Sequence, residues 1–539
     1  MSRKPRIGAK ALLESLERAQ AEVIFGYPGG NIVDVFNLLP FTKFKFVLAR
    51  HEQGAVHMAD GYARATGRAG VALVTSGPGA ANTISALATA NMDGVPLVLI
   101  SGQVPLSQIG TDAFQEADMS GICRAATKHS FLVKSADEIP QTVAEAFYIA
   151  MHGKPGAVVI DLPLNVQQEL TSADYPERIC LRAYHPEFAA PQRSISMLAK
   201  IINKSKRPVI YAGGGVIASG AADDLMNLAQ KAQIPVVTTL MGIGSVDGAS
   251  PLSLGMAGIY GVQVANTALS KADFIFALGV RFNDRITKVF KPAKNVKIVH
   301  VDCDASSIEK NIPVTLGIVS DVKEVLTIVS SRVKPNSHKE WLDSLARLKE
   351  ASHADVLAEK GENSISQRCA VRAIAKATNG DCILVTDVGQ HQMSAARHFP
   401  HSSPRRFLSS GGMGTMGFGI PAAIGAAIGR KDEKVVAVIG DGGAQMTSQE
   451  LKVASDEHLN IMFVVFNNSS LGMIRQMQKN YFVGNFTNPD FALLAKAYGL
   501  KSATVSDPAK LDSVLAKAVK YKGPVLVEVV LDKPCKNLN

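Results

Sequence analysis

Short runs of β-branched and aliphatic residues alternate with longer Ala- and Leu-rich segments along almost the whole chain. This alternation is typical of parallel strands joined by crossover helices, and each apolar run is short enough to be one buried strand. The runs fall into three groups in chain order: 71–76, 96–101 and 157–163; 208–215, 234–239, 274–280 and 297–302; 383–389, 434–443, 460–468 and 524–532. We therefore predict an α/β chain with three doubly wound parallel-sheet domains.

Breaks in the alternation indicate the domain boundaries. A chain of 539 residues is too long for one hydrophobic core. A polar stretch with prolines at 167–191 separates the first two groups, and a Lys-, Glu- and Ala-rich segment at 337–364, with the only tryptophan (Trp341), precedes the third. We expect domains at residues 1–170, 190–335 and 365–539, with 337–364 as a connecting helical segment.

Composition narrows the class of protein. The chain is 47% hydrophobic and 19% charged, which is typical of a folded protein and not of a disordered one. Its formal charge of +10 comes from scattered basic residues, so neither a nucleic-acid partner nor a membrane surface is indicated. The six cysteines form no CxxC pair, and the N-terminus lacks the apolar core of a signal peptide. These features favour reduced thiols and a cytoplasmic location.

A Gly440-Asp441-Gly442 sequence follows the apolar run 435–439, and Asn468 ends the run that follows. Both polar residues are therefore expected at carboxyl ends of parallel strands, the edge of such a sheet where ligands bind. Asp441 and Asn468 offer the hard oxygen ligands that Mg²⁺ requires when it also binds a diphosphate. Gly-Asp-Gly alone would be interpreted as a tight turn, but the asparagine at the neighbouring strand end favours a metal–diphosphate site.

With these residues in place, the sequence resembles the thiamine-diphosphate enzymes, whose signature is Gly-Asp-Gly followed by an asparagine pair. Further segments resemble the acetolactate (acetohydroxyacid) synthase catalytic subunits over about residues 7–532: 25–30, 50–67, 75–82, 110–122, 127–134, 279–287, 386–393 and 410–426. The resemblance implies the three-domain fold of thiamine-diphosphate enzymes. It also implies decarboxylation of pyruvate and ligation of the hydroxyethyl unit to a second 2-keto acid, the first common step of branched-chain amino acid biosynthesis. Pyruvate would give 2-acetolactate and 2-ketobutyrate would give 2-aceto-2-hydroxybutyrate.

The resemblance also implies which residues bind thiamine diphosphate. Glu52 matches the glutamate that hydrogen-bonds the aminopyrimidine ring and aids its tautomerisation, and Met416 matches the residue that keeps the cofactor bent. Taken alone, Glu52 would be interpreted as a surface carboxylate and Met416 as core filling. The implied metal ligands are Asp441, Asn468 and Ser470. The other implied contacts are Tyr27, Pro28, Gly29, Pro78, Asn82, Gln115, Val388, Gly389, Gln390, His391, Gly414, Gly442, Gly443, Leu471, Gly472 and Met473.

Substrate residues are implied by the same matches. Arg285 matches the arginine that binds the carboxylate of the second keto acid, a task suited to a fixed, always charged donor. Without the resemblance, an arginine in a loop would be interpreted as a surface residue. The implied substrate contacts are Phe114, Gln115, Lys128, Arg285, Met473 and Met477, and the implied catalytic residues are Glu52, Gln115, Lys128 and Arg285.

A second cofactor is expected in the middle domain. Three glycines, Gly213-Gly214-Gly215, follow a predicted strand and could bind a dinucleotide, but a lone glycine triplet is a weak signal. The resemblance adds FAD, with a structural and not a redox role. The implied contacts besides the glycines are Arg182, Thr239, Leu240, Met241, Gly258, Ile259, Tyr260, Gly279, Arg281, Asp284, Arg285, Asp302, Cys303, Asp321, Gln392 and Met393.

Three departures from the family pattern bear on the reaction. Met477 stands where the biosynthetic enzymes have a tryptophan, and a flexible thioether offers no flat wall, so the preference between pyruvate and 2-ketobutyrate stays open. Tyr260 replaces a histidine that contacts the flavin. The chain stops at 532–539, before the tail that covers the active site in the family, which would favour simple decarboxylation.

The resemblance also implies partners. Glu52 and Asp441 belong to different predicted domains, and in the family these domains meet across a subunit interface, so we expect a homodimer at least, or a tetramer, with a regulatory small subunit. No nucleic acid and no membrane partner is expected. Two alternatives stay open: another thiamine-diphosphate decarboxylase or carboligase, and a non-catalytic homologue, against which the presence of Glu52, Asp441 and Asn468 argues.

Overall fold

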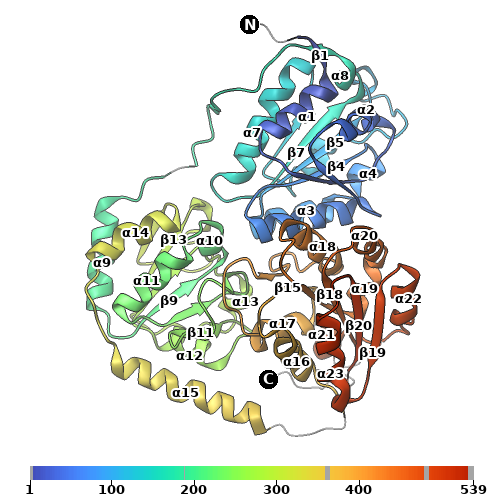
Figure 1. Cartoon of the computed structure of the whole chain (residues 1–539). Helices are drawn as coiled ribbons and strands as arrows, with labels where there is room; N and C mark the ends of the chain where they lie inside the picture. The colour runs from blue at the N-terminus through green and yellow to red at the C-terminus, as the bar shows by residue number, and fades with distance from the viewer. Residues whose placement is uncertain (1–3, 187, 359–363, 479–484, 532–539) are drawn as a thin grey trace.

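Three six-stranded parallel sheets with helices on their faces make up the structure, a computed structural model that describes residues 4–186, 188–358, 364–478 and 485–531 (Figure 1). The predicted fold class is thereby confirmed. Within the described residues, no helix is both long enough and apolar enough to cross a membrane.

The first sheet has the strand order β3-β2-β4-β5-β7-β6. Its strands are β2 (Val23–Gly26), β3 (Lys45–Leu48), β4 (Gly70–Val74), β5 (Leu97–Gln103), β6 (His129–Leu132) and β7 (Ala157–Pro163). The helices that cover it include α1 (Gly8–Arg18), α3 (Glu52–Thr66), α5 (Ile84–Asp93) and α7 (Ile139–Met151). A short antiparallel pair, β1 (Arg6–Ile7) and β8 (Leu170–Thr171), closes this unit.

The third sheet repeats this topology with the order β16-β15-β17-β18-β20-β19. In both sheets the second strand in chain order lies at the edge, the first lies inside it, and the last two strands are exchanged. The strands are β15 (Ile383–Thr386), β16 (Phe407–Leu408), β17 (Val435–Gly440), β18 (Ile461–Asn467), β19 (Lys501–Val505) and β20 (Val525–Val530). The neighbouring helices include α16 (Gln367–Thr378), α17 (Gln390–His398), α18 (Gly419–Gly429), α21 (Gly472–Met477) and α23 (Pro508–Val519).

The central sheet differs, with the order β11-β10-β9-β12-β13-β14. In chain order this is 3-2-1-4-5-6, the order of dinucleotide-binding doubly wound sheets, in which the ligand lies between the first and fourth strands. The strands are β9 (Pro208–Ala212), β10 (Val236–Thr238), β11 (Ser253–Met256), β12 (Phe274–Leu278), β13 (Lys297–Asp302) and β14 (Leu316–Val319). The helices include α9 (Gln192–Lys204), α10 (Gly214–Ala218), α11 (Ala222–Ala232), α12 (Gln263–Lys271) and α14 (Val322–Arg332).

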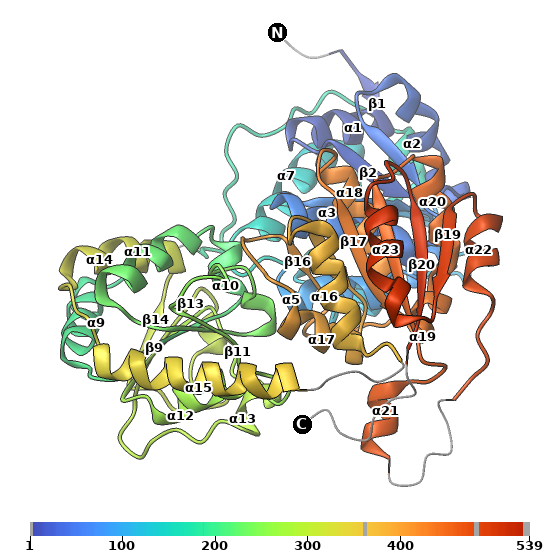
Figure 2. The same ribbon diagram turned by 60° about the horizontal axis from the view of Figure 1, so that its bottom comes forward.

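The predicted connecting segment forms a long helix, α15 (Lys339–Ala358), which runs along the central domain beside α12 (Figure 2). Its Trp341 is buried in the core of that domain with Leu345, and the indole Nε1 donates a hydrogen bond to the Pro208 carbonyl at 3.1 Å. The start of this segment is therefore part of the central domain and not only a connection.

The first and third domains pack through α3 and α18 (Figure 1). Two glycines allow the helix backbones to touch. A side chain at Gly61 would overlap the backbone of Ala422, and one at Gly425 would overlap the backbone of Met58. One apolar cluster consequently continues from β4 and β5 of the first sheet through both helices to β17 and β18 of the third.

Candidate active site

Polar and glycine residues follow the carboxyl ends of the strands in the first domain and form the first half-site, defined as Tyr27–Gly29, Glu52, Pro78 and Asn82. Glu52 is the first residue of α3, and its carboxylate accepts a hydrogen bond from the Asn82 amide at 3.0 Å. Gly79, in the turn that carries Asn82, lies so close that a side chain there would stand 3.3 Å from the Glu52 carboxylate. The predicted Glu52 and Asn82 therefore meet.

A second glutamate supports the start of α3 from the third domain. Glu450 is fully buried, and its carboxylate accepts a hydrogen bond from the Arg50 backbone N–H at 3.0 Å, two residues before Glu52. Burial raises the pKa of Glu450 to about 7, although the backbone donors oppose that rise. Glu450 was not predicted, because nothing in the local sequence marks a carboxylate whose hydrogen-bond partner lies 400 positions away.

The predicted substrate residues Phe114 and Gln115 lie on a loop whose shape is fixed by hydrogen bonds to the Glu116 carboxylate. Glu116 accepts backbone hydrogen bonds from Gly110 and Ala113. Gln115 has a φ of 62° and packs against Gly77, itself at 57°. A non-glycine residue in this left-handed region is strained, and such residues are concentrated at functional sites. The Phe114 side chain is 87% exposed.

The second half-site lies at the carboxyl ends of the third sheet and consists of Asp387–His391, Met416, Asp441–Gly443 and Asn468–Met473. Asp441 is buried, and burial raises the pKa of its carboxyl. The Asn488 amide opposes that rise with a hydrogen bond of 2.9 Å, and the same amide donates to Asn467 at 2.7 Å. Asn488 was missed because it follows no predicted strand.

Backbone N–H groups hold the side chains of two of the three predicted metal ligands. The Asp441 carboxylate accepts a hydrogen bond from the Gly442 N–H at 3.0 Å, and the Asn468 side-chain oxygen accepts one from the N–H of the third predicted ligand, Ser470, at 3.1 Å. Among the described residues, no group of three or more His, Cys, Asp or Glu side chains gathers as a metal site. One buried carboxylate beside neutral amide oxygens instead fits a hard cation that takes further ligands from a phosphate.

Around these ligands, glycines leave room for an anion. Side chains at Gly389 or Gly440 would press on the His391 ring, and one at Gly472 would overlap Gln390 and approach Asn468. Burial lowers the pKa of His391 to about 4, and its Nε2 atom has no hydrogen-bond partner within the described part of the chain. A buried ring nitrogen without a partner fits a site that is completed by a bound ligand.

The loop that bears Met416 is fixed to the strand ends by Asp387. Its buried carboxylate accepts backbone hydrogen bonds from Val388 at 2.8 Å, Gly417 at 3.0 Å and Gly419 at 2.9 Å. Burial raises the pKa of Asp387 to about 6. A side chain at Gly442 would stand 3.3 Å from the end of the Met416 side chain. The predicted Met416 therefore lies over the Gly-Asp-Gly turn, and Asp387 is a further missed residue.

Most of the predicted flavin residues lie at the carboxyl edge of the central sheet, whereas Arg182 lies in the segment before α9, and Gln392 and Met393 lie in α17 of the third domain. Side chains at Gly213 or Gly215 would overlap the backbone of Gly279, the residue after β12. This is the point between the first and fourth strands where dinucleotides bind, and the glycines leave their backbones open for close approach. Gly214 contacts Met241, and the Ile259 N–H donates to the Arg285 carbonyl at 2.9 Å. Asp302 is the last residue of β13, and Cys303 directly follows it.

Other predicted residues have different surroundings. The Lys128 ammonium donates to the carbonyls of Ile149 and His152 and to the Tyr184 hydroxyl, and burial lowers its pKa to about 8. The Arg285 side chain is 59% exposed and lies 3.9 Å from the Asp284 carboxylate. Met477 is 61% exposed at the end of α21, and residues 532–539 lie outside the described residues. The predicted substrate residues thus come from all three domains: Phe114, Gln115 and Lys128 from the first, Arg285 from the central one, and Met473 and Met477 from α21 of the third.

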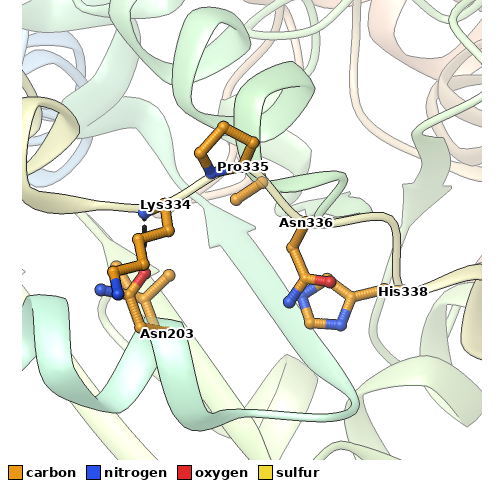
Figure 3. Close-up of a pocket in the computed structure, with 7 residues that line it drawn as sticks. Asn203, Lys334, Pro335, Asn336 and His338 are labelled. Atoms are coloured by element: carbon orange, nitrogen blue, oxygen red, sulfur yellow. Dashed lines mark hydrogen bonds between the residues drawn. The ribbon is translucent and has the colours of Figure 1, made fainter.

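A polar hollow in the central domain contains none of the predicted residues (Figure 3). It has a volume of about 240 Å³, and Asn203, Lys334, Asn336 and His338 are among its lining residues. It lies at the C-terminal ends of α9 and α11, next to the segments that lead into β9 and β10. This is the amino edge of the sheet, opposite to the edge that carries the glycines.

Comparison with known families agrees with this arrangement. The chain matches the N-terminal TPP binding domain of the thiamine pyrophosphate enzymes at residues 6–122, their central domain at 195–329 and their C-terminal TPP binding domain at 387–529. The class defined by the fold and the two half-sites is therefore that of a thiamine pyrophosphate enzyme.

Similar proteins narrow the class. An acetolactate synthase large subunit of Buchnera aphidicola subsp. Schizaphis graminum is 42% identical over 95% of this chain and 92% of its own length. That of Lactococcus lactis subsp. lactis is 41% identical over 98% of this chain and 93% of its own. The large subunit of isozyme 3 from Escherichia coli is 41% identical over 97% and 95%. This chain belongs to the acetolactate synthase large-subunit family.

Proposed function

We propose that the chain joins two 2-keto acids with loss of carbon dioxide, as an acetolactate synthase. Pyruvate is the donor, and pyruvate or 2-ketobutyrate is the acceptor, so that the products enter branched-chain amino acid biosynthesis. The observation that carries this proposal is the pair of half-sites. One presents a carboxylate, Glu52, beside Asn82. The other presents Asp441 and Asn468 beside a glycine-lined space, where a buried His391 nitrogen has no hydrogen-bond partner among the residues that the structure describes.

The half-sites suit the two ends of thiamine diphosphate. When bound, this cofactor supplies a nucleophilic carbon and accepts the electrons left by carbon dioxide. Glu52 would hold a proton at a ring nitrogen of the aminopyrimidine. Asp441, Asn468 and Ser470 would hold Mg²⁺ against the diphosphate, because a buried carboxylate and amide oxygens are hard ligands. Met416, which lies over the Gly-Asp-Gly turn, would keep the cofactor bent.

FAD belongs to the proposal as a structural cofactor of the central domain. The strand order and the approach of Gly213 and Gly215 to Gly279 support it. Asp302 ends β13 and Asp321 lies just beyond the end of the neighbouring β14, at the same edge. Arg281 lies where this domain meets the first, since its guanidinium donates a hydrogen bond to the Met92 carbonyl. Gln392 donates to Ser409 within the third domain, and its neighbour Met393 packs against a cluster that contains Ile243 and Met256 of the central domain. Flavin bound here would bridge separate parts of the chain.

A homodimer at least, a regulatory small subunit and a cytoplasmic location complete the proposal. Glu52 accepts its hydrogen bond from within the first domain, and Asp441 accepts those described above from within the third. A second copy would bring one first half-site to one second half-site. Exposed apolar residues support such an interface: Met92, Phe114, Ile122, Met413 and Met477 are all at least 42% exposed.

The proposal is tested by steady-state turnover of pyruvate with thiamine diphosphate and Mg²⁺, with and without FAD, detecting acetolactate and acetaldehyde separately. We expect acetolactate, and we expect Glu52→Gln to lower kcat at least 100-fold because general acid–base groups contribute about 10²–10⁴. Glu145→Gln on α7 is the matched control and should keep full turnover.

Acetaldehyde as the only product would identify a different thiamine-diphosphate decarboxylase. No turnover by the wild-type chain, with cofactor binding intact, would contradict both functions.

A further inference from the structure

Asp93 is the last residue of α5, and its side chain is fully buried at the junction of the three domains. Its carboxylate accepts backbone hydrogen bonds from Gly411 at 3.0 Å and Gly412 at 2.7 Å. Arg64 of α3 donates to the same carboxylate at 3.0 Å. A buried carboxylate is stable only with such donors, so these contacts hold one another in place.

The segment held by Asp93 is the loop between β16 and α18, residues 409–418, which carries Met416. The first domain contacts this loop at two further points. Arg64 donates to the Ser409 carbonyl at 2.9 Å, and the hydroxyls of Thr89 and Thr415 lie 2.6 Å apart. Thr415 directly precedes Met416, so the position of that side chain over the Gly-Asp-Gly turn depends on contacts made by α3 and α5.

The central domain contacts the same carboxylate. The Arg281 guanidinium lies 3.9 Å from Asp93 and donates to the Met92 carbonyl at 2.6 Å. A side chain at Gly411 would overlap the Met241 sulfur, and one at Gly412 would stand 3.1 Å from the Arg281 guanidinium. Arg281 and Met241 belong to the edge of the central sheet where FAD is proposed to bind. Asp93 therefore touches both the loop of the thiamine site and the flavin edge.

We propose that Asp93 is a positioning residue that holds the Met416 loop and couples flavin binding in the central domain to thiamine diphosphate binding in the active site. FAD that orders Arg281 and Met241 also orders the loop through Asp93, so each cofactor strengthens binding of the other. The coupling must be equal in both directions. This inference rests on the proposed function, in particular on the presence of both cofactors.

The test is calorimetric titration of the purified whole chain with thiamine diphosphate in Mg²⁺, first without FAD and then with saturating FAD. We expect FAD to tighten binding of thiamine diphosphate in the wild type by about five-fold or more, as is typical of coupled sites. In Asp93→Asn, which keeps the shape but removes the charge, we expect the two affinities to become equal. In the matched control Asp273→Asn, the coupling should stay as in the wild type, because Asp273 also accepts two backbone N–H groups but at the start of β9.

Thr89→Val is the milder variant if Asp93→Asn does not fold. It removes the hydroxyl contact to Thr415 and a hydrogen bond to the Ser85 carbonyl within α5, but it leaves the contacts of Asp93 in place, so the coupling should fall without disappearing. Wild-type affinity that is the same with and without FAD would overturn the inference, as would full coupling in folded Asp93→Asn. Failure of the wild type to bind thiamine diphosphate at all would instead contradict the proposed function.

Discussion

At the scale of single residues, buried carboxylates position the active-site loops through backbone N–H groups. Glu450 supports the segment before Glu52, Asp387 supports the turns around Met416, and Asp93 supports the loop that leads to it. Each carboxylate loses hydration on burial, and the N–H groups replace it only in one loop conformation. We therefore expect a change at any of these three residues to affect the reaction through the position of a loop.

Glu450 gives a prediction about pH and stability. Its pKa rises from 4.5 in the unfolded chain to about 7 in the folded one, so the folded state binds the extra proton. The stabilisation is complete below pH 4.5 and is lost as the pH rises through about 7. Compared with Glu450→Gln, the wild type should therefore lose stability between pH 5 and pH 8, by an amount on the order of 3 kcal/mol.

The measurement is the melting temperature of both proteins at pH 5, 6, 7 and 8. The melting temperature of the wild type minus that of Glu450→Gln should decrease steadily from pH 5 to pH 8. A constant difference would show that Glu450 does not titrate in this range and would contradict the prediction.

The sequence predicted the residues that stand directly after strands and missed those whose partners are distant. Asp441 and Asn468 stand at the ends of apolar runs, whereas Glu52 follows no predicted strand and was implied by the family resemblance; in the structure it lies beside Asn82. Glu450 and Asn488 reach the site from a helix start and a loop, and their hydrogen bonds depend on the packing of the chain. Local patterns give no signal for such contacts. The roles of the predicted site residues stay predictions.

At the scale of elements, the contact between α3 and α18 depends on glycine at Gly61 and Gly425. The nearest atoms to an added side chain at either position are backbone atoms of the other helix, which cannot rotate aside. The helices therefore meet at one separation only, and this separation places Glu52, at the start of α3, relative to Glu450.

We predict that Gly61→Ala destabilises the chain by about 1–3 kcal/mol, the usual cost of overpacking. This cost outweighs the gain of about 1 kcal/mol that alanine brings to a helix interior. Thermal unfolding measures the effect. Gly30→Ala is the control, since no atom lies within 4 Å of the added carbon, and it should melt close to the wild type. Equal melting temperatures for Gly61→Ala and the wild type would contradict the tight crossing.

Each of the eleven predicted apolar runs contains a strand, whereas seven other parallel strands in the described residues were not predicted. Among these, β16 has only two residues, and β3, β6 and β19 are partly or mostly solvent-accessible, so their sequences lack a continuous apolar run. Strands at sheet edges form because a neighbour offers hydrogen-bonding groups, which the sequence of the strand itself does not show. The predicted strands lie mainly in the buried centres of the sheets.

At the scale of the whole molecule, the single tryptophan reports on one domain. Trp341 is buried against the central sheet, so its emission follows the integrity of that domain and not of the others. We predict that FAD at about 100 times its Kd stabilises this domain by about 2.7 kcal/mol. The urea midpoint of the Trp341 emission maximum should rise by about 1 M or more.

The control is Trp341→Phe, which should lose the tryptophan emission and so show that the emission comes from this residue. If FAD is bound but the urea midpoint of the Trp341 emission stays unchanged, the flavin binds elsewhere in the chain.

The first and third sheets share one strand order, although the edges that they present differ in character. One edge offers a carboxylate and an amide side by side, suited to a flat heteroaromatic ring. The other offers open glycine turns beside oxygen ligands, suited to a compact double anion and its counter-ion. A ligand with a heteroaromatic ring at one end and a metal-bound diphosphate at the other needs two binding sites of different chemistry. This chain provides them on two sheets of the same strand order, whose turns after the strands differ.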